Sequence, residues 1–93
     1  MNSPDIKQFI REHSSLFWYT PEDKKEEISH EFLVETILNY GDIVAVRQLL
    51  KLLGVKRASN IFFDSIQISE RRRGNYHELT RNFFTLFFKR YAN

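Results

Sequence analysis

ILNYGDIVAVRQLLKLLG, residues 37–54, decides the fold, because it holds one complete helix together with the signals for both of its ends. Gly41 is a typical residue to end a helix, and Asp42 is a typical N-cap for the next one. Gly54 then ends the helix predicted over residues 43–53. That helix is apolar over more than half of its circumference, so we expect it at the centre of an all-helical domain. Its apolar positions are 43, 44, 46, 49, 50, 52 and 53.

Two further start signals precede this stretch. A Ser-Pro pair followed by an acid at residues 3–5 predicts a helix over about residues 4–13. The segment TPED repeats the signal at the head of a long helix predicted over residues 20–40. Between the two helices, SSLFWYT (residues 14–20) gathers four large apolar side chains without helical spacing. We expect an extended connector whose aromatic rings cover the core, since exposing them all would be costly.

The C-terminal part of the chain predicts two more helices. One runs from residue 55 or 56 to residue 65, and the last spans about residues 77–91. Apolar and polar residues alternate at the start of segment 66–77, which is therefore either a small hairpin or a loop that turns at Gly74-Asn75. The expected fold class is all-α, a compact bundle of about five helices that forms one domain over residues 1–93.

Composition agrees with a small folded domain. The 93 residues are 42% apolar and include nine phenylalanines, too hydrophobic a mixture for a disordered tail. The absence of cysteine excludes disulfides, a thiolate nucleophile and a Cys-based zinc site. No apolar run approaches the length of a bilayer span, and the N-terminal segment lacks a signal-peptide pattern. A cytoplasmic protein, neither exported nor membrane-spanning, is expected.

Charge is divided unevenly along the chain. Residues 1–46 hold nine acids against four bases, and residues 47–93 hold ten bases against three acids. Either the two halves pack together and partly neutralise each other, or the C-terminal half presents a basic surface to an acidic partner, which could be a protein or a nucleic acid.

Catalytic and metal-binding patterns are weak. His13, His30 and His77 are far apart, and no pair has the spacing that places two ligands on one helix face. The sequence contains neither a P-loop nor a GxGxxG motif. A row of carboxylates on the second predicted helix has lysines beside it and is typical of a solvated face. That row consists of Glu26, Glu27, Glu31 and Glu35. We therefore expect a protein that is not an enzyme and that holds no metal or cofactor.

A helix-turn-helix-like segment covers residues 46–63, VRQLLKLLGVKRASNIFF. Leu50, Gly54 and Val55 fit the pattern of a first helix, a turn and an apolar residue. In such a motif the second helix would offer polar groups to a DNA groove. Those groups are Lys56, Arg57, Ser59 and Asn60. The fit is incomplete, because the apolar anchor expected six residues after the glycine is Asn60, and Ile61 stands one position late.

The last predicted helix carries more apolar surface than one helix usually buries. Its phenylalanines form two rows of i, i+4 pairs about 100° apart, so with two leucines the helix is apolar over most of its circumference. Either the helix is threaded through the centre of the bundle, or another chain covers part of it. Phenylalanine and arginine often anchor interfaces, so this helix and the basic residues near it are the expected partner-binding site. The residues expected to bind the partner are Arg71, Arg72, Arg73, Arg81, Phe84, Phe88 and Arg90. A homodimer is a further interpretation of the same surface.

Several motifs together resemble a family of small bacterial domains of largely unknown function. They are Phe17-Trp18, Tyr40-Gly41-Asp42, the leucine-rich segment 46–53 and Asn82-Phe83-Phe84. The similarity covers about residues 15–90 and carries no catalytic residue. Such proteins are often encoded beside AbiEii-type nucleotidyltransferase toxins, so the resemblance implies an antitoxin that binds and neutralises a toxin. The segment RRRGNYHE departs from the family pattern, so a role for its arginines is not part of what the resemblance implies.

Overall fold

The computed structural model describes residues 3–18, 20–68 and 76–92, which form helices and short connections without any strand in those ranges. The prediction of an all-helical fold is confirmed. The helices are α1 (Pro4–Glu12), α2 (His30–Tyr40), α3 (Ile43–Leu53), α4 (Val55–Ile68) and α6 (Glu78–Tyr91). Two 3-10 segments, η1 (Ser14–Phe17) and η2 (Glu22–Glu27), lie between α1 and α2.

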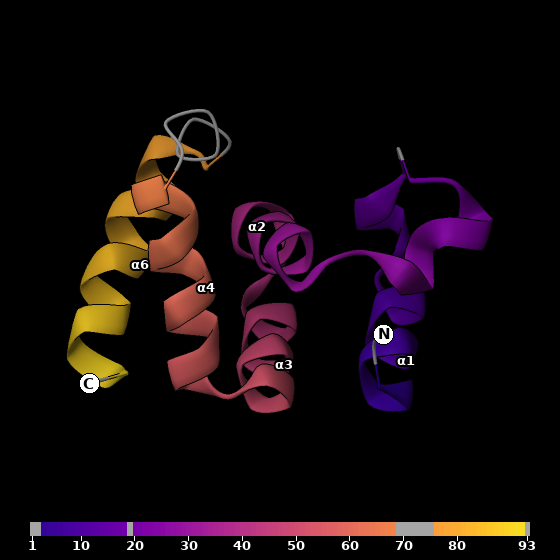
Figure 1. The fold of residues 1–93 in the computed structure, drawn as a ribbon, viewed down its shortest axis with the longest axis horizontal. Coiled ribbons are helices and arrows are strands. Elements are labelled where there is room, and N and C mark those ends of the chain that lie inside the picture. The colour runs from indigo at the N-terminus through magenta and orange to yellow at the C-terminus, as the bar shows by residue number, and fades with distance from the viewer. Residues whose placement is uncertain (1–2, 19, 69–75, 93) are drawn as a thin grey trace.

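The helices follow one another along the longest dimension of the molecule, 34 Å (Figure 1). In the middle, α2 packs against both α3 and α4. At one end α6 packs against α4, and at the other end α1 packs against η2. Because α6 is an outer helix, the alternative in which the last helix is threaded through the centre is wrong.

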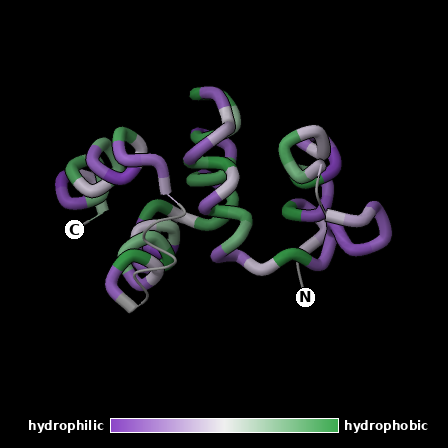
Figure 2. Tube along the Cα trace, turned by 90° about the horizontal axis from the view of Figure 1, so that it is seen from above, coloured by the Kyte–Doolittle hydropathy of each residue, from purple (hydrophilic) through white to green (hydrophobic). Residues whose placement is uncertain are grey.

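One apolar core connects the row of helices. Apolar residues recur along each helix rather than in one block, the pattern of helices that bury one side (Figure 2). Side chains from α1, η1, α2, α3, α4 and α6 meet in a single cluster. Its largest fully buried members are Ile10, Phe17, Leu33, Val34, Ile37, Leu49, Phe62 and Phe88.

Side-chain caps fix the starts of α1 and α3. Ser3 Oγ accepts a hydrogen bond from the amide of Ile6 at 3.4 Å, which starts α1 as the Ser-Pro pair predicts. Asp42 Oδ1 accepts from the amide of Ala45 at 2.8 Å and starts α3, again as predicted.

The prediction of one long helix over residues 20–40 is wrong, because an extended residue interrupts the helix in the middle of that range. After the 3-10 segment η2, Ile28 is extended (φ −64°, ψ 149°). Ser29 then caps α2, since its Oγ accepts a hydrogen bond from the amide of Phe32 at 3.1 Å. This second cap inside a continuous helical pattern ends one element and begins another, so η2 is free to turn towards α1.

The connector over residues 14–20 also differs from the prediction. It contains η1 instead of an extended strand-like segment, and Phe17 is fully buried. Trp18 does not cover the core, because 78% of its surface is exposed.

Gly41 ends α2 for a spatial reason. Its φ of −76° is open to any residue, but a Cβ at this position would lie 2.7 Å from the carbonyl oxygen of Ile37 and 3.2 Å from Cβ of Ala45. Glycine thus lets α3 approach the end of α2. Gly54 is required for a different reason, its backbone conformation: a φ of 87°, where α3 ends and α4 begins, favours glycine.

Gly41→Ala is expected to lower the free energy of unfolding by about 1 to 3 kcal/mol, because the closest atom to the new methyl group is a backbone oxygen that cannot move independently. Urea unfolding followed by circular dichroism measures the change. Adding Ala45→Gly removes only the contact with Cβ of Ala45 and leaves those with the carbonyl oxygen and Cγ2 of Ile37, so it should not restore stability. Full restoration by that second change would contradict the explanation.

The segment over residues 66–77 is helical at its start. Because α4 continues to Ile68, the hairpin alternative is wrong for residues 66–68, whose backbone forms helical hydrogen bonds. The predicted turn at Gly74-Asn75 lies outside the described residues. Among the helices that the structure describes, none combines the length and the apolar character needed to span a bilayer.

Candidate protein-binding surface

The two sides of α6 have different environments. Phe84 and Phe88 are buried against α4, where the ring of Phe62 lies 6.5 Å and 5.5 Å from theirs between centroids. The other side of the helix is exposed. Its apolar side chains are Leu79 (84% exposed), Phe83 (59%), Leu86 (71%) and Tyr91 (61%). The prediction that Phe88 contacts a partner is therefore wrong, because its ring is fully buried in the core that joins α6 to α4. Phe84 is 7% exposed and also lines a groove between α6 and α3, so its contact with a partner stays a prediction.

Aromatic contacts hold the exposed side of α6 in a fixed shape. The rings of Phe83 and Phe87 stack at 6.1 Å between centroids, with only 17° between their planes. The ring of Phe87 in turn lies 5.0 Å from that of Tyr91. Each pair is separated by four residues, the spacing that brings side chains together on a helix. This row presents large apolar area with little rotamer freedom left to lose on binding.

A groove between α3 and α6 continues this exposed side. It has a volume of about 510 Å³, and Leu38 of α2 also lines it. A shallower cleft of about 410 Å³ lies over the C-terminal half of α6 and shares Phe83 and Phe87 with the groove. We call the combined apolar surface the α3–α6 face. Its apolar residues are Leu38, Ile43, Val46, Leu50, Leu79, Phe83, Phe84, Leu86, Phe87 and Tyr91.

Contacts at the start of α6 orient the face. The amide of His77 donates to Oδ1 of Asn39 at 3.0 Å. Its imidazole packs edge-on against the ring of Tyr40, with centroids 5.0 Å apart, and its Nε2 lies 3.2 Å from the Tyr40 hydroxyl. These contacts with the end of α2 position the start of α6.

Basic residues outnumber acids on α3 and α6, and two of them line the α3–α6 face. The two helices that border it carry five bases, Arg47, Lys51, Arg81, Lys89 and Arg90, against one acid, Glu78. Arg47 lines the groove on the α3 side. Arg90 lines the cleft at the other end, with its guanidinium carbon 5.5 Å from the centre of the Tyr91 ring. The carboxylate of Asp42 also lines the groove, but it caps α3.

Of the arginines predicted to bind a partner, the structure describes Arg81 and Arg90, and these two lie on different sides of α6. Arg90 lies at the edge of the face, as expected. Arg81 is half-buried, and it precedes Phe84 by three residues and Phe88 by seven, so it shares their side of the helix rather than the exposed side. Arg71, Arg72 and Arg73 lie outside the described residues.

Sequence reasoning did not assign Ile43, Leu79, Phe83 and Leu86 to the site. Ile43 is 67% exposed although the apolar pattern of its helix predicts a central position. The available signal was the length of one phenylalanine row: Leu79, Phe83, Phe87 and Tyr91 follow one another at intervals of four residues, whereas the neighbouring row holds only Phe84 and Phe88. Apolar surface therefore extends beyond the row that the core buries.

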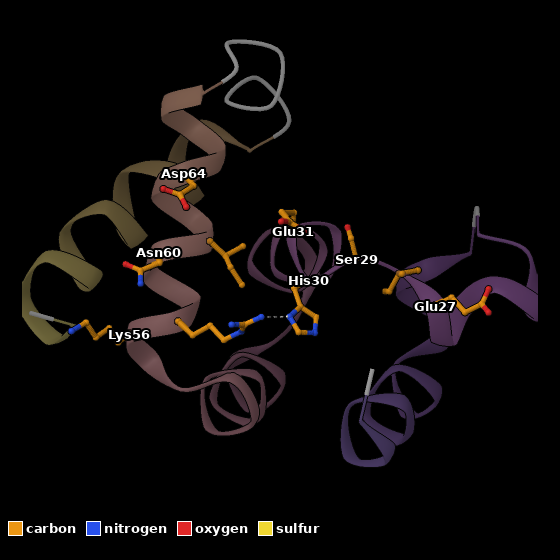
Figure 3. Close-up of a pocket in the computed structure, with 10 residues that line it drawn as sticks. Glu27, Ser29, His30, Glu31, Lys56, Asn60 and Asp64 are labelled. Atoms are coloured by element: carbon orange, nitrogen blue, oxygen red, sulfur yellow. Dashed lines mark hydrogen bonds between the residues drawn. The ribbon is translucent and has the colours of Figure 1, made fainter. Parts of the chain in front are cut away.

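A second groove, about 890 Å³ in volume, separates the start of α2 from α4 and is lined by three of the four residues predicted to bind DNA, Lys56, Arg57 and Asn60. Figure 3 shows Lys56 and Asn60 on α4, across the groove from His30. A dashed line there joins His30 to Arg57, whose Nη2 donates to Nδ1 of the imidazole at 3.0 Å. Ser59 is buried, so its predicted role as a groove-facing group is wrong.

The surroundings of this second groove are unfavourable for a phosphate backbone. Three carboxylates, Glu27, Glu31 and Asp64, line it together with the two basic side chains. Asn60 is exposed rather than buried, and Ile61 beside it packs against the core, so α4 is anchored one position later than in the helix-turn-helix pattern. The structure thus brings Lys56, Arg57 and Asn60 together but surrounds them with negative charge.

Titratable groups also gather at the acidic end of the molecule, where α1 meets η2. Arg11 pairs with Glu26 (Nε to Oε2, 2.7 Å) and with Glu22 (Nη1 to Oε2, 2.8 Å). Lys25 is buried and donates to Glu22 Oε1 at 2.8 Å and to the carbonyl of Ser14 at 3.2 Å. The hydrogen bond from Lys25, then that from Arg11, holds the pKa of Glu22 below its usual value. The hydrogen bond with Glu26 raises the pKa of Arg11.

These contacts predict a pH dependence for folding. Because the pKa of Glu22 is lower in the folded chain than its usual 4.5, its ionised form stabilises the fold above that pH, and this contribution is lost as the pH falls through the lowered value. Urea unfolding between pH 7 and pH 3 should therefore show a smaller loss of stability for Glu22→Gln than for the original chain. Glu12→Gln, an exposed carboxylate on α1, is the matched control and should follow the original chain. Identical pH profiles for all three proteins would contradict this assignment.

No group of three or more His, Asp or Glu side chains within residues 3–18, 20–68 and 76–92 is placed to hold a metal ion. Nδ1 of His13 lies 2.9 Å from the carbonyl oxygen of Phe9, His30 contacts Arg57, and His77 contacts Tyr40. Comparison with protein-family models, with curated proteins and with solved structures finds no match for this chain.

Proposed function

We propose that this protein binds another protein through the α3–α6 face and acts as an antitoxin that neutralises its partner. The observation that carries the proposal is the exposed side of α6, where four large apolar side chains lie next to a groove and are not covered by the rest of the described chain. Apolar surface of this extent on a small protein is typical of an interaction site. The antitoxin role rests on the family resemblance described above.

The proposed mechanism is occlusion of a nucleotidyltransferase toxin. Such an enzyme holds its catalytic metal ions with carboxylates, so its active-site region is negatively charged. The helices bordering the α3–α6 face are basic, and opposite charges would steer the two proteins together and orient the complex. The apolar side chains would supply most of the affinity once the surfaces meet.

Binding of DNA by residues 46–63 is the alternative proposal, and it has less support. Arg57 is paired with His30, Ser59 is buried, and carboxylates share the groove with Lys56. A DNA-binding protein of this kind should bind a duplex more tightly as salt falls, and should lose that binding when Lys56 and Arg57 are both replaced by alanine. Binding that does not depend on salt, or that survives the double change, excludes this use of the segment.

Co-expression tests the antitoxin proposal directly. The tagged protein is produced together with the product of each adjacent reading frame, and both complex formation and growth are measured. We expect one neighbour to be toxic when expressed alone, and to be both bound and neutralised by this protein. If no neighbour is toxic, or if a toxic neighbour is neither bound nor neutralised, the proposal is wrong.

A further inference from the structure

We infer that the α3–α6 face receives an amphipathic α-helix of the partner, with carboxylates on both flanks of its apolar stripe. This inference rests on the proposed function and specifies the element that the partner supplies. Its basis is the shape of the groove, the spacing of the exposed apolar side chains and the sign of the charges around them.

The walls of the groove favour a helix over an extended peptide. Both walls are rows of helical side chains, from α3 on one side and α6 on the other. Within residues 3–18, 20–68 and 76–92 there is no strand edge to which an extended segment could add a strand. Without such an edge, an extended peptide would leave its own backbone groups unpaired against apolar side chains, whereas a helix satisfies them internally.

The spacing of the exposed residues fits the apolar stripe of a helix. Leu79, Phe83 and Phe87 follow one another at intervals of four, and Leu86 widens this row towards the shallow cleft. The stacked rings of Phe83 and Phe87 line both hollows, so they form a ridge between them. Apolar side chains three and four residues apart on an incoming helix can enter the hollows on either side of that ridge.

The charges at the edges select an acidic helix. Arg47 on the α3 side and Arg90 at the opposite end each line one of the two hollows. The carboxylate that shares the groove with Arg47, that of Asp42, is engaged in a hydrogen bond with the amide of Ala45. Carboxylates on the flanks of an incoming helix can pair with them while its apolar stripe fills the groove. A second copy of this chain fits less well, since a twofold contact through the same face would bring the same cations together.

Two synthetic peptides of about 18 residues test the inference, since isolated helices need about this length to form. Both are alanine-based, with leucines spaced by three and four residues, and their flanks carry glutamate in one and lysine in the other. Fluorescence anisotropy at low salt should show the glutamate peptide binding at least about tenfold more tightly. The difference should shrink at about 0.5 M salt, where exposed charges are screened.

Charge-reversal variants test whether Arg47 and Arg90 cause the preference for the glutamate peptide. Arg47→Glu combined with Arg90→Glu should remove or reverse it, whereas Lys56→Glu, an exposed change on α4 outside the face, should preserve it. Circular dichroism verifies that each variant is folded. Equal binding of the two peptides, absence of binding, or a preference that persists in the double variant would each overturn the inference. A rise in mass of the protein alone that is reversed by Leu86→Asp would overturn it too, by showing that a second copy occupies the face.

The outcome separates this inference from the proposed function. If neither peptide binds while the protein still forms a neutralising complex with its toxic neighbour, the partner element is not an acidic helix and the antitoxin role stands. If the glutamate peptide binds but no neighbour does, the face takes acidic helices and the antitoxin role is wrong.

Discussion

Phe88→Ala is expected to lower the free energy of unfolding by about 3 to 5 kcal/mol, because it empties a site that is fully buried in the core. The ring of Phe88 contacts those of Phe62, Phe63 and Phe84, with centroids 5.5 Å, 6.4 Å and 5.6 Å away. Removing it creates a cavity at the junction of α4 and α6. The total free energy of unfolding of small domains is about 5 to 15 kcal/mol, so the variant should lose a large share of its stability.

Phe83→Ala is the matched control on the same helix. Phe83 is largely exposed and loses mainly its stacking on Phe87, so the expected change is less than about 1 kcal/mol. Urea unfolding of both variants measures the difference. Phe88→Leu keeps most of the buried volume and should cost less than about 1.5 kcal/mol, which provides a folded variant if Phe88→Ala does not fold. Equal losses for Phe83→Ala and Phe88→Ala would show that α6 is not oriented as described.

This contrast shows how far the sequence can predict the site. The two phenylalanine rows of α6 are equivalent in spacing, so periodicity predicts an excess of apolar surface but not which row is buried. Residues distant in sequence determine which row is buried. The main ones are Phe62 on α4, and Asn39 and Tyr40 at the end of α2, which contact His77. Such contacts leave no signal in a local pattern.

Helix boundaries show the same division between local and distant causes. Ser3, Asp42 and Gly54 act within a few residues of their own position, and the structure confirms each of the ends that they predict. The break between η2 and α2 depends on more than a local signal. Ser29 caps α2, but the 3-10 path of the preceding residues is held by Arg11, eleven residues or more away in the chain.

Leu86→Asp is expected to weaken the complex with the partner at least about a hundredfold. Leu86 is exposed on the α3–α6 face, so a carboxylate there would lose its bound water in the complex without gaining a hydrogen-bond donor in exchange. Trp18→Asp is the matched control, since Trp18 is similarly exposed but lies between η1 and η2 in the chain, in the acidic part of the molecule where η2 packs against α1. It should leave the affinity within about threefold of the original, the scale of an exposed change.

The affinity of each variant for the co-expressed toxin can be measured by surface plasmon resonance, together with the rescue of growth. Because Leu86 is exposed in the free protein, Leu86→Asp should change the free energy of unfolding by no more than about 0.5 kcal/mol, and urea unfolding verifies that lost binding is not lost folding. Unchanged affinity for Leu86→Asp would exclude the α3–α6 face as the binding surface. Loss of affinity with Trp18→Asp alone would place the interface at the acidic end of the molecule instead.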